Sequence, residues 1–328
     1  MLHWGLLATG VIARKFAATV NAMGQAEQNV LVACAAREQT RAQAFADEFS
    51  IPTAYGSYEQ LVNDPAVDIV YISSPNNLHA EHIRLCLAHG KHVLCEKPFT
   101  FIAKDAAELY ALAAEKGLFL MEALWTYHLP LIQKAQQLLA EGAIGQVQHL
   151  RADYGFIATG ARRVRKFRSE LAGGALLDIG IYNLAFARQM LGSHLGNFTG
   201  QPKLSEFGTD WFSHITGEYA GGITAAMTAC IGLQMPVQGV VYGTEGQLFF
   251  PNYQQAQKMV LIKNNGEEEV FEMPFDHTGF EYQVRECARC IAQGLTASPV
   301  YPPQTSIAHM DELDRIRAAW GMKFACEA

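Results

Sequence analysis

Short apolar runs alternate with helical segments over the first 123 residues, and this order constrains the fold more than any other feature. We predict strands at HWGLLA, VLVACAA, VDIVYISS and KHVLCEK, with helices such as AEHIRLCLAHG between them. Strands that alternate with helices form a parallel sheet covered on both faces. Residues 1–123 therefore form a doubly wound Rossmann domain, which binds ligands beyond the carboxyl ends of its strands.

After residue 123 the strand pattern changes to longer runs with alternating polarity. These runs are QVQHLRADYGF, DWFSHITGEYA, GITAAMTACIGL, VQGVVYG and QKMVLIK. They predict an α+β domain over residues 124–328, built on an open, mostly antiparallel sheet. In GITAAMTACIGL one face is apolar and the other is small and weakly polar. We expect the second face to form a homodimer interface, with an internal layer of helices as the alternative.

Composition excludes several partners. The chain has 328 residues, 50% of them hydrophobic, and a net charge of −7, which does not attract nucleic acid or an anionic membrane. No 18-residue apolar run exists, and MLHWGLLATG lacks the features of a secretory signal. We expect no nucleic-acid or membrane partner and a cytoplasmic location. The seven cysteines are expected to be reduced thiols.

The segment GLLATGVIA, residues 5–13, has most of the dinucleotide-binding pattern. Gly10 lets the backbone approach a pyrophosphate, Ala13 allows close packing, and the start of the following helix favours negative charge. Ala8 stands where the first glycine is expected, so the turn must accommodate a methyl group. An ordinary strand–helix turn is the alternative. The predicted cofactor contacts here are Ala8, Thr9, Gly10, Val11 and Ile12.

The second predicted strand ends in CAAREQTR. Arg37 lies where NAD-binding proteins place an acid, and a guanidinium suits the 2′-phosphate of NADP. NADP is therefore the preferred cofactor, with a solvated arginine as the alternative. Glu38 keeps NAD possible.

Two polar segments follow later strands of the same domain: ISSPNNLH, residues 72–79, and CEKPF, residues 95–99. The carboxyl ends of parallel strands meet at one edge, so these side chains are expected to crowd one crevice. The predicted cofactor contacts there are Ser74, Pro75, Asn76, Leu78, His79, Glu96 and Lys97.

The Glu96–Lys97–Pro98 triplet resembles the hallmark of the Gfo/Idh/MocA oxidoreductase family (glucose-fructose oxidoreductase, inositol dehydrogenase and rhizopine-catabolism oxidoreductase). LMEALWTYHLP and GGALLDIGIY extend the resemblance over nearly the whole chain. They are most similar to its branch of dimeric dihydrodiol dehydrogenases and NADP-dependent xylose dehydrogenases. The resemblance implies a cis proline bond and a catalytic Lys97 facing the nicotinamide. A lysine that reaches solvent beside Glu96 is the alternative.

The segment GGALLDIGIYN, residues 173–183, places Asp178 and Tyr182 on one face of a helix. The preceding glycines allow other backbone to approach the helix start. The resemblance implies that Tyr182 moves the substrate proton and that Asp178 orients it. A phenol with a pKa near about 10 needs a neighbouring cation such as Lys97 to act at neutral pH. An amphipathic core helix is the alternative.

The run ARRVRKFR, residues 161–168, precedes this helix. By resemblance Arg165 lies near the cofactor or substrate, whereas the other basic residues are expected in solvent. The resemblance also implies an aromatic substrate wall of Trp125, Tyr154 and Phe280, which suits a sugar or ring diol.

No metal is predicted. His79 with His82, and Cys287 with Cys290, have ligand-like spacing, but neither has a second pair.

We therefore predict an NAD(P)-dependent dehydrogenase that transfers a hydride to or from a carbinol carbon of a sugar, such as xylose, or of a cyclic trans-diol. The alternatives are a non-catalytic NADP-sensing protein on the same fold and a sugar reductase of the 1,5-anhydrofructose type.

Overall fold

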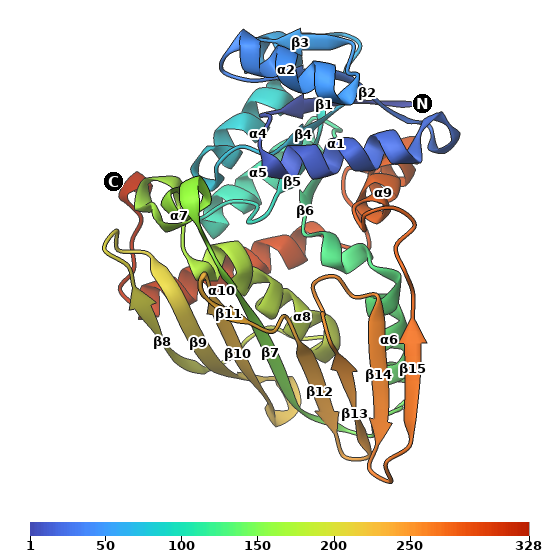
Figure 1. The fold of residues 1–328 in the computed structure, drawn as a ribbon, viewed down its shortest axis with the longest axis vertical. Coiled ribbons are helices and arrows are strands. Elements are labelled where there is room, and N and C mark those ends of the chain that lie inside the picture. The colour runs from blue at the N-terminus through green and yellow to red at the C-terminus, as the bar shows by residue number, and fades with distance from the viewer. Residues whose placement is uncertain (328) are drawn as a thin grey trace. The chain divides into compact units, whose positions relative to one another are not determined.

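The computed structural model describes residues 1–327, and the side chains of all of these except residues 25, 161 and 162. Two compact units divide the chain (Figure 1). The first contains Met1–Trp125 and Asp276–Ile307, and the second contains Thr126–Phe275 and the segment from Ala308 onward.

The first unit contains a six-stranded parallel sheet in the order β3-β2-β1-β4-β5-β6, which confirms the Rossmann prediction. The strands are β1 (Leu2–Leu7), β2 (Asn29–Ala35), β3 (Thr53–Tyr55), β4 (Ile69–Ile72), β5 (His92–Glu96) and β6 (Leu120–Ala123). Helices cover both faces of such a sheet, so its central strands are almost wholly apolar and buried. In this core Phe16 stacks on Tyr71 with ring centroids 3.8 Å apart.

Helices connect the successive strands of this sheet. They are α1 (Val11–Met23), α2 (Gln39–Phe49), α3 (Tyr58–Val62), α4 (His79–Ala88) and α5 (Ala103–Glu115). Two later helices, α9 (Glu281–Ala292) and α10 (Pro303–Ala319), close the chain.

Residues 276–307 belong to the first unit, whereas the sequence pattern placed all residues after 123 in one consecutive domain. Polar contacts explain this return of the chain. The Arg285 guanidinium donates to both carboxylate oxygens of Glu27 at 2.6 and 2.9 Å, and the hydroxyls of Thr278 and Thr19 lie 2.5 Å apart. The amphipathic pattern of α9 does not reveal which sheet it covers.

The second unit has a nine-stranded sheet in the order β15-β14-β13-β12-β7-β10-β9-β8, with β11 paired to β7. Its strands are β7 (Val147–Ile157), β8 (Phe198–Leu204), β9 (Asp210–Tyr219), β10 (Ile223–Cys230), β11 (Gly232–Met235), β12 (Gly239–Gly243), β13 (Gly246–Phe250), β14 (Lys258–Lys263) and β15 (Glu268–Glu272). Strands β7 and β10 pair in parallel and the other pairs are antiparallel. The prediction of a mostly antiparallel sheet is confirmed.

Alternation along the central strands separates the two faces of this sheet. Ala225, Met227 and Ile215 are buried on the face that contacts α8 (Ile181–Leu191). On the opposite face, His214 and Thr216 are exposed and the Arg151 side chain is 52% exposed. Two further helices of this unit are α6 (Pro130–Ala140) and α7 (Gly160–Phe167).

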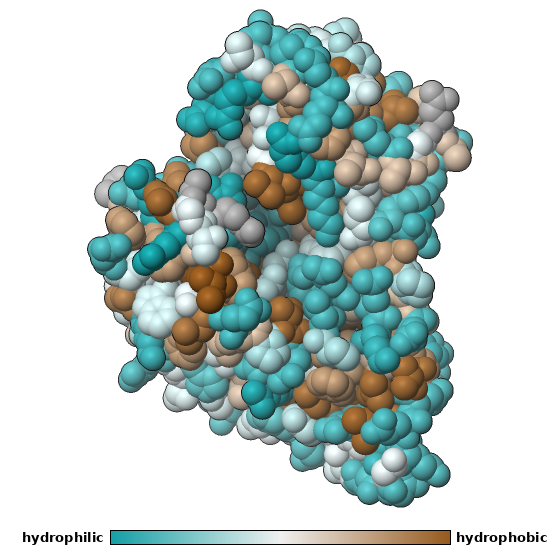
Figure 2. All heavy atoms as spheres, in the orientation of Figure 1, coloured by the Kyte–Doolittle hydropathy of each residue, from teal (hydrophilic) through white to brown (hydrophobic). Residues whose placement is uncertain are grey.

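None of the helices among residues 1–327 is both long and apolar enough to cross a membrane. On the face drawn in Figure 2, hydrophilic residues surround separate hydrophobic patches.

Candidate active site

The turn between β1 and α1 has the backbone form of a dinucleotide-binding loop. Ala8 has a φ of 76°, in the left-handed region that favours glycine, so the turn tolerates the methyl group in a strained conformation. Gly10 is the N-cap of α1 and has no side chain that could cap the first amides, and a Cβ placed there would meet nothing within 4 Å. The uncapped amides and the open space at Gly10 fit a pyrophosphate.

Arg37 is exposed just beyond the end of β2. Arg41 lies one turn further along the chain, on α2, and the sequence reasoning did not name it. Burial raises the pKa of Tyr58, and the positive charges of Arg37 and Arg41 act in the opposite direction. Both guanidiniums therefore lie near the same ring. The spacing of four residues between Arg37 and Arg41 is the sequence feature that could have identified Arg41.

The segment after β4 is held by buried side chains. His79 is fully buried, and its ring nitrogens lie 2.9 Å from the carbonyl oxygens of Ser74 and Pro98. His82 Nδ1 lies 2.8 Å from Ser74 Oγ. Since both nitrogens of His79 already face backbone oxygens, this ring fixes two loops. Pro75, Asn76 and Leu78 are half-buried.

The Glu96–Lys97–Pro98 triplet follows β5, and its proline bond is cis as the resemblance implied. Glu96 accepts a hydrogen bond from the Tyr71 hydroxyl at 2.5 Å and from the Lys97 amide at 3.2 Å. Burial raises the pKa of Glu96, whereas these bonds and the nearby Lys15 charge act in the opposite direction. Lys97 itself is half-buried.

Two residues of the predicted substrate wall, Trp125 and Phe280, enclose a lysine. Lys15 on α1 places its ammonium 4.4 Å from the Trp125 ring centroid and 4.0 Å from that of Phe280. Both rings are only 2% exposed. Burial lowers the pKa of Lys15, while Glu96 and Glu281 oppose that shift. A substrate at these rings must share them with a cation that the sequence reasoning did not name.

In the second unit, a π-helical turn, Leu176–Gly180, leads into α8. It carries Asp178, four residues before Tyr182 in α8. Turns of this kind are frequent at functional sites. A Cβ on Gly173 would lie 2.4 Å from the Lys166 carbonyl oxygen, and one on Gly174 would lie 2.3 Å from Asp210 Oδ1. The glycines therefore allow the close approach that the sequence indicated.

A buried acid anchors the start of this helical segment. Asp210, at the first position of β9, is fully buried and accepts a hydrogen bond from the Leu176 amide at 2.8 Å. Burial raises the pKa of Asp210 to about 7. The sequence reasoning missed this residue, because its contact depends on the approach of β9 to a segment more than 30 positions earlier in the chain.

Aromatic side chains gather beside Tyr182 within the second unit. The rings of Tyr154 and Tyr182 are 6.0 Å apart. The next residue, Asn183, donates to the Thr228 carbonyl at 2.9 Å and accepts from the Tyr253 hydroxyl. Tyr154, the remaining wall residue, is thus adjacent to the predicted proton carrier.

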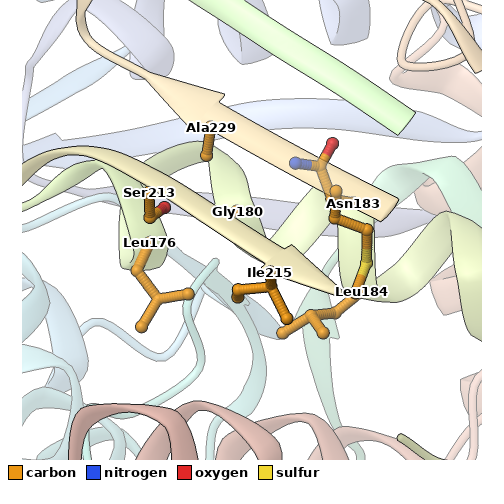
Figure 3. Close-up of a pocket in the computed structure, with 8 residues that line it drawn as sticks. Leu176, Gly180, Asn183, Leu184, Ser213, Ile215 and Ala229 are labelled. Carbon is orange, nitrogen blue, oxygen red and sulfur yellow. The ribbon is translucent and has the colours of Figure 1, made fainter. Parts of the chain in front are cut away.

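A small cavity lies between α8 and the strands β9 and β10. Figure 3 shows Leu176, Gly180, Asn183, Leu184, Ser213, Ile215 and Ala229 around it. Its volume is about 10 Å³, which is room for about one water molecule. This cavity is too small for a sugar or a diol.

Lys166 forms an ion pair with Asp178. The side chains are 11% and 20% exposed, and the ammonium lies 5.3 Å from the Phe156 ring centroid. The expectation that the basic residues other than Arg165 face solvent is therefore wrong for Lys166. Arg165 is exposed on α7. On α7 it is Lys166, and not its neighbour Arg165, whose side chain pairs with Asp178.

Among residues 1–327, no group of three or more His, Cys, Asp or Glu side chains is arranged to hold a metal ion. Cys287 and Cys290 are buried in α9.

Residues 2–124 match an oxidoreductase family with an NAD-binding Rossmann fold, and residues 132–249 match the GFO/IDH/MocA C-terminal domain. The trans-1,2-dihydrobenzene-1,2-diol dehydrogenases of Mus musculus and Homo sapiens are 33% and 35% identical to this chain. Each alignment covers 98% of both proteins.

A 3-ketoreductase from Actinomadura kijaniata, solved with NADP and TDP-benzene, has a TM-score of 0.85 and 27% identity, with 97% of each chain covered. Variants of that reductase with a replaced lysine and a replaced tyrosine have also been solved.

The raised pKa of Asp210 predicts a pH-dependent stability. Between its unfolded pKa and about 7, the folded chain holds a proton that the unfolded chain has lost, so stability falls as pH rises through this window. Asp210→Asn keeps an oxygen for the Leu176 amide and removes this titration. We expect its unfolding free energy, relative to wild type, to rise by about 1–3 kcal/mol from pH 5 to 8, from about 1.4 kcal/mol per pKa unit. Urea unfolding at each pH measures the two free energies. A difference between variant and wild type that stays constant with pH would contradict the prediction.

Proposed function

The chain belongs to the GFO/IDH/MocA family and is an NAD(P)-dependent oxidoreductase, and on this premise we propose that it transfers a hydride reversibly between NADP(H) and a carbinol carbon of a sugar or cyclic trans-diol. The observation that carries the proposal is the fixed Glu96–Lys97–Pro98 turn at the carboxyl edge of the Rossmann sheet. Asp178 and Tyr182, one turn apart, supply the other polar groups.

The proposed chemistry divides between a hydride and a proton. Bound NADP⁺ supplies the hydride acceptor. As the carbinol carbon loses its hydride, the Tyr182 oxygen takes the hydroxyl proton, and the Lys97 ammonium favours the phenolate form that accepts it. Asp178, paired with Lys166, orients the hydroxyl. The lysine and tyrosine variants of the related ketoreductase support the choice of these two residue types.

The proposed cofactor contacts follow the carboxyl edge of the sheet. Backbone amides at Gly10 and its neighbours bind the pyrophosphate, and Arg37 with Arg41 binds the 2′-phosphate. The NADP in the related ketoreductase supports this preference. The remaining proposed contacts are Ser74, Pro75, Asn76, Leu78, His79, Glu96, Lys97 and Arg165.

The substrate is proposed to meet aromatic rings, because ring diols and sugars both present flat apolar faces. Trp125 and Phe280 supply two of them and Tyr154 a third. The dihydrodiol dehydrogenase names of the relatives support the diol class.

We further propose a homodimer and a cytoplasmic location. The exposed face of β9, β10 and β7 supports the first, because it offers a broad sheet surface. The seven cysteines are unpaired and six are buried, which fits a reducing compartment.

Substitution of the proton-transfer pair tests the mechanism. Wild-type enzyme with NADP⁺ is expected to form NADPH with a member of a panel of pentoses, hexoses and trans-dihydrodiols. Tyr182→Phe and Lys97→Met should each lower kcat by about 10²- to 10⁴-fold, the usual contribution of general acid–base catalysis. NADPH binding, followed by nucleotide fluorescence, should stay within about threefold because the phosphate contacts remain. A Tyr182→Phe enzyme with near-normal kcat would make the tyrosine structural.

Cofactor preference is tested at Arg37. Arg37→Asp removes a charge-assisted phosphate contact and adds repulsion, so the preference for NADP over NAD should shift by about 2–4 kcal/mol. The ratio of kcat/KM for the two cofactors measures this shift. An unchanged ratio removes Arg37 from the site.

Assembly is tested on the exposed sheet face. Light scattering at micromolar concentration should give twice the mass of one chain. Ala226→Arg places a second cation opposite Arg151 on this face, so it should yield monomers. The control Gln148→Arg, at an exposed position of the other face, should stay dimeric. A monomeric wild type defeats the proposal.

A further inference from the structure

The peptide group that joins Pro98 to Phe99 is held at both ends by buried side chains. Its carbonyl oxygen lies 2.9 Å from His79 Nδ1, and its N–H donates to Glu122 Oε1 at 2.9 Å. His79 belongs to α4 and Glu122 to β6, so separate elements fix one peptide. This peptide comes directly after Lys97 and its proline.

Glu122 is a buried carboxylate with its own supports. It is 0% exposed, and its Oε2 accepts hydrogen bonds from the Tyr301 hydroxyl at 2.6 Å and the Ser306 hydroxyl at 2.5 Å. Tyr301 and Ser306 belong to the returning segment, residues 276–307, of the same unit. The two hydroxyls orient the carboxylate so that its other oxygen meets the Phe99 amide.

At the carbonyl end of this peptide, the contact is the His79 ring, which is uncharged near neutral pH. Burial lowers the pKa of His79 to about 4. A neutral imidazole carries one N–H, and the ring lies between the carbonyl oxygens of Ser74 and Pro98. His79 therefore limits the movement of the Pro98 carbonyl by a close, fully buried contact.

Stability alone gives a weak reason for a carboxylate at position 122. Burying a charge is costly, and well-packed apolar residues often replace buried ionic groups without loss of stability. A fixed acceptor has a second use here, because a catalytic group displaced by about 1 Å can lose about 10²-fold in rate. Glu122 holds the peptide whose position sets where the Lys97 side chain begins.

We propose that Glu122 is a positioning residue for Lys97: through the Phe99 amide, and against the His79 ring, it holds the turn in the orientation that catalysis requires. This inference rests on the proposed catalytic role of Lys97. It assigns Glu122 no contact with substrate or cofactor.

The decisive comparison is between Glu122→Met and Glu122→Gln. Methionine fills a similar volume but offers the Phe99 amide no strong acceptor, so kcat should fall by at least about tenfold. Glutamine keeps an amide oxygen for Phe99 and an NH₂ that donates to the hydroxyls, so its kcat should stay within about threefold of wild type. In both variants NADPH affinity and substrate KM should change less than about threefold.

Tyr301→Phe is the matched control. It removes one of the two hydroxyl donors to Glu122 Oε2, and the Ser306 hydroxyl still orients the carboxylate. It should therefore lower the melting temperature while kcat stays within about threefold. A purely structural Glu122 would behave like this control, with lost stability and an unchanged kcat per NADPH-binding site.

A double-mutant cycle shows whether Glu122 acts through Lys97. In a Lys97→Met background, Glu122→Met should lower the residual kcat by less than about twofold, because residues that act as one unit are non-additive. Should Glu122→Met fail to fold, His79→Phe tests the same peptide from its carbonyl end. The same loss of kcat and the same cycle are expected, with NADPH affinity within about threefold of wild type; weaker NADPH binding would assign the loss to the cofactor contact instead.

The possible failures are distinguishable. If Lys97→Met abolishes turnover while the Glu122→Met and His79→Phe enzymes keep wild-type kcat, the positioning role is wrong and the proposed function stands. A full additional loss in the Lys97→Met background also overturns positioning through Lys97. If Lys97→Met itself keeps normal kcat, the proposed function fails first.

Discussion

Hydrogen bonds along the carboxyl edge of the parallel sheet connect the loops of the first unit from β1 to β6. The Ser73 hydroxyl donates to the Ala8 carbonyl at 3.2 Å, His79 contacts the carbonyls of Ser74 and Pro98, and Glu122 accepts from the Phe99 amide. A parallel sheet delivers these loops to one edge but does not determine their conformations. The buried side chains do so, and the proposed contacts to cofactor and substrate depend on them.

In the second unit, the buried acid Asp210 fixes the conformation of a segment, as Glu122 does in the first. The segment that carries Asp178 must begin against β9, and only glycine at position 174, with its φ of 113°, leaves room for Asp210. Asp210 in turn satisfies the Leu176 amide. Each unit fixes its own proposed catalytic segment through internal contacts. Mutations can therefore alter the orientation of Lys97 and that of Tyr182 separately.

Sequence reasoning reached the fold class, the Rossmann strands and the glycine-dependent helix start, because each has a local pattern of polarity or spacing. It did not reach the membership of residues 276–307 in the first unit, which depends on contacts such as Arg285 with Glu27. It also missed the Lys166–Asp178 pair and the position of Lys15 between two aromatic rings. The spacing of apolar residues predicts which face of a helix a residue lies on. It does not predict which other helix or strand that face packs against.

Lys15 and Lys166 bear on the proposed substrate class. Each unit holds a partly desolvated ammonium beside aromatic rings and a carboxylate: Lys15 with Trp125, Phe280 and Glu96, and Lys166 with Phe156 and Asp178. A neutral polyol can exchange hydrogen bonds with either group without adding charge, whereas a cationic substrate beside either one would add a like charge next to a partly desolvated ammonium. The charges within each unit therefore support the proposal of a neutral sugar or diol rather than a cationic amino sugar.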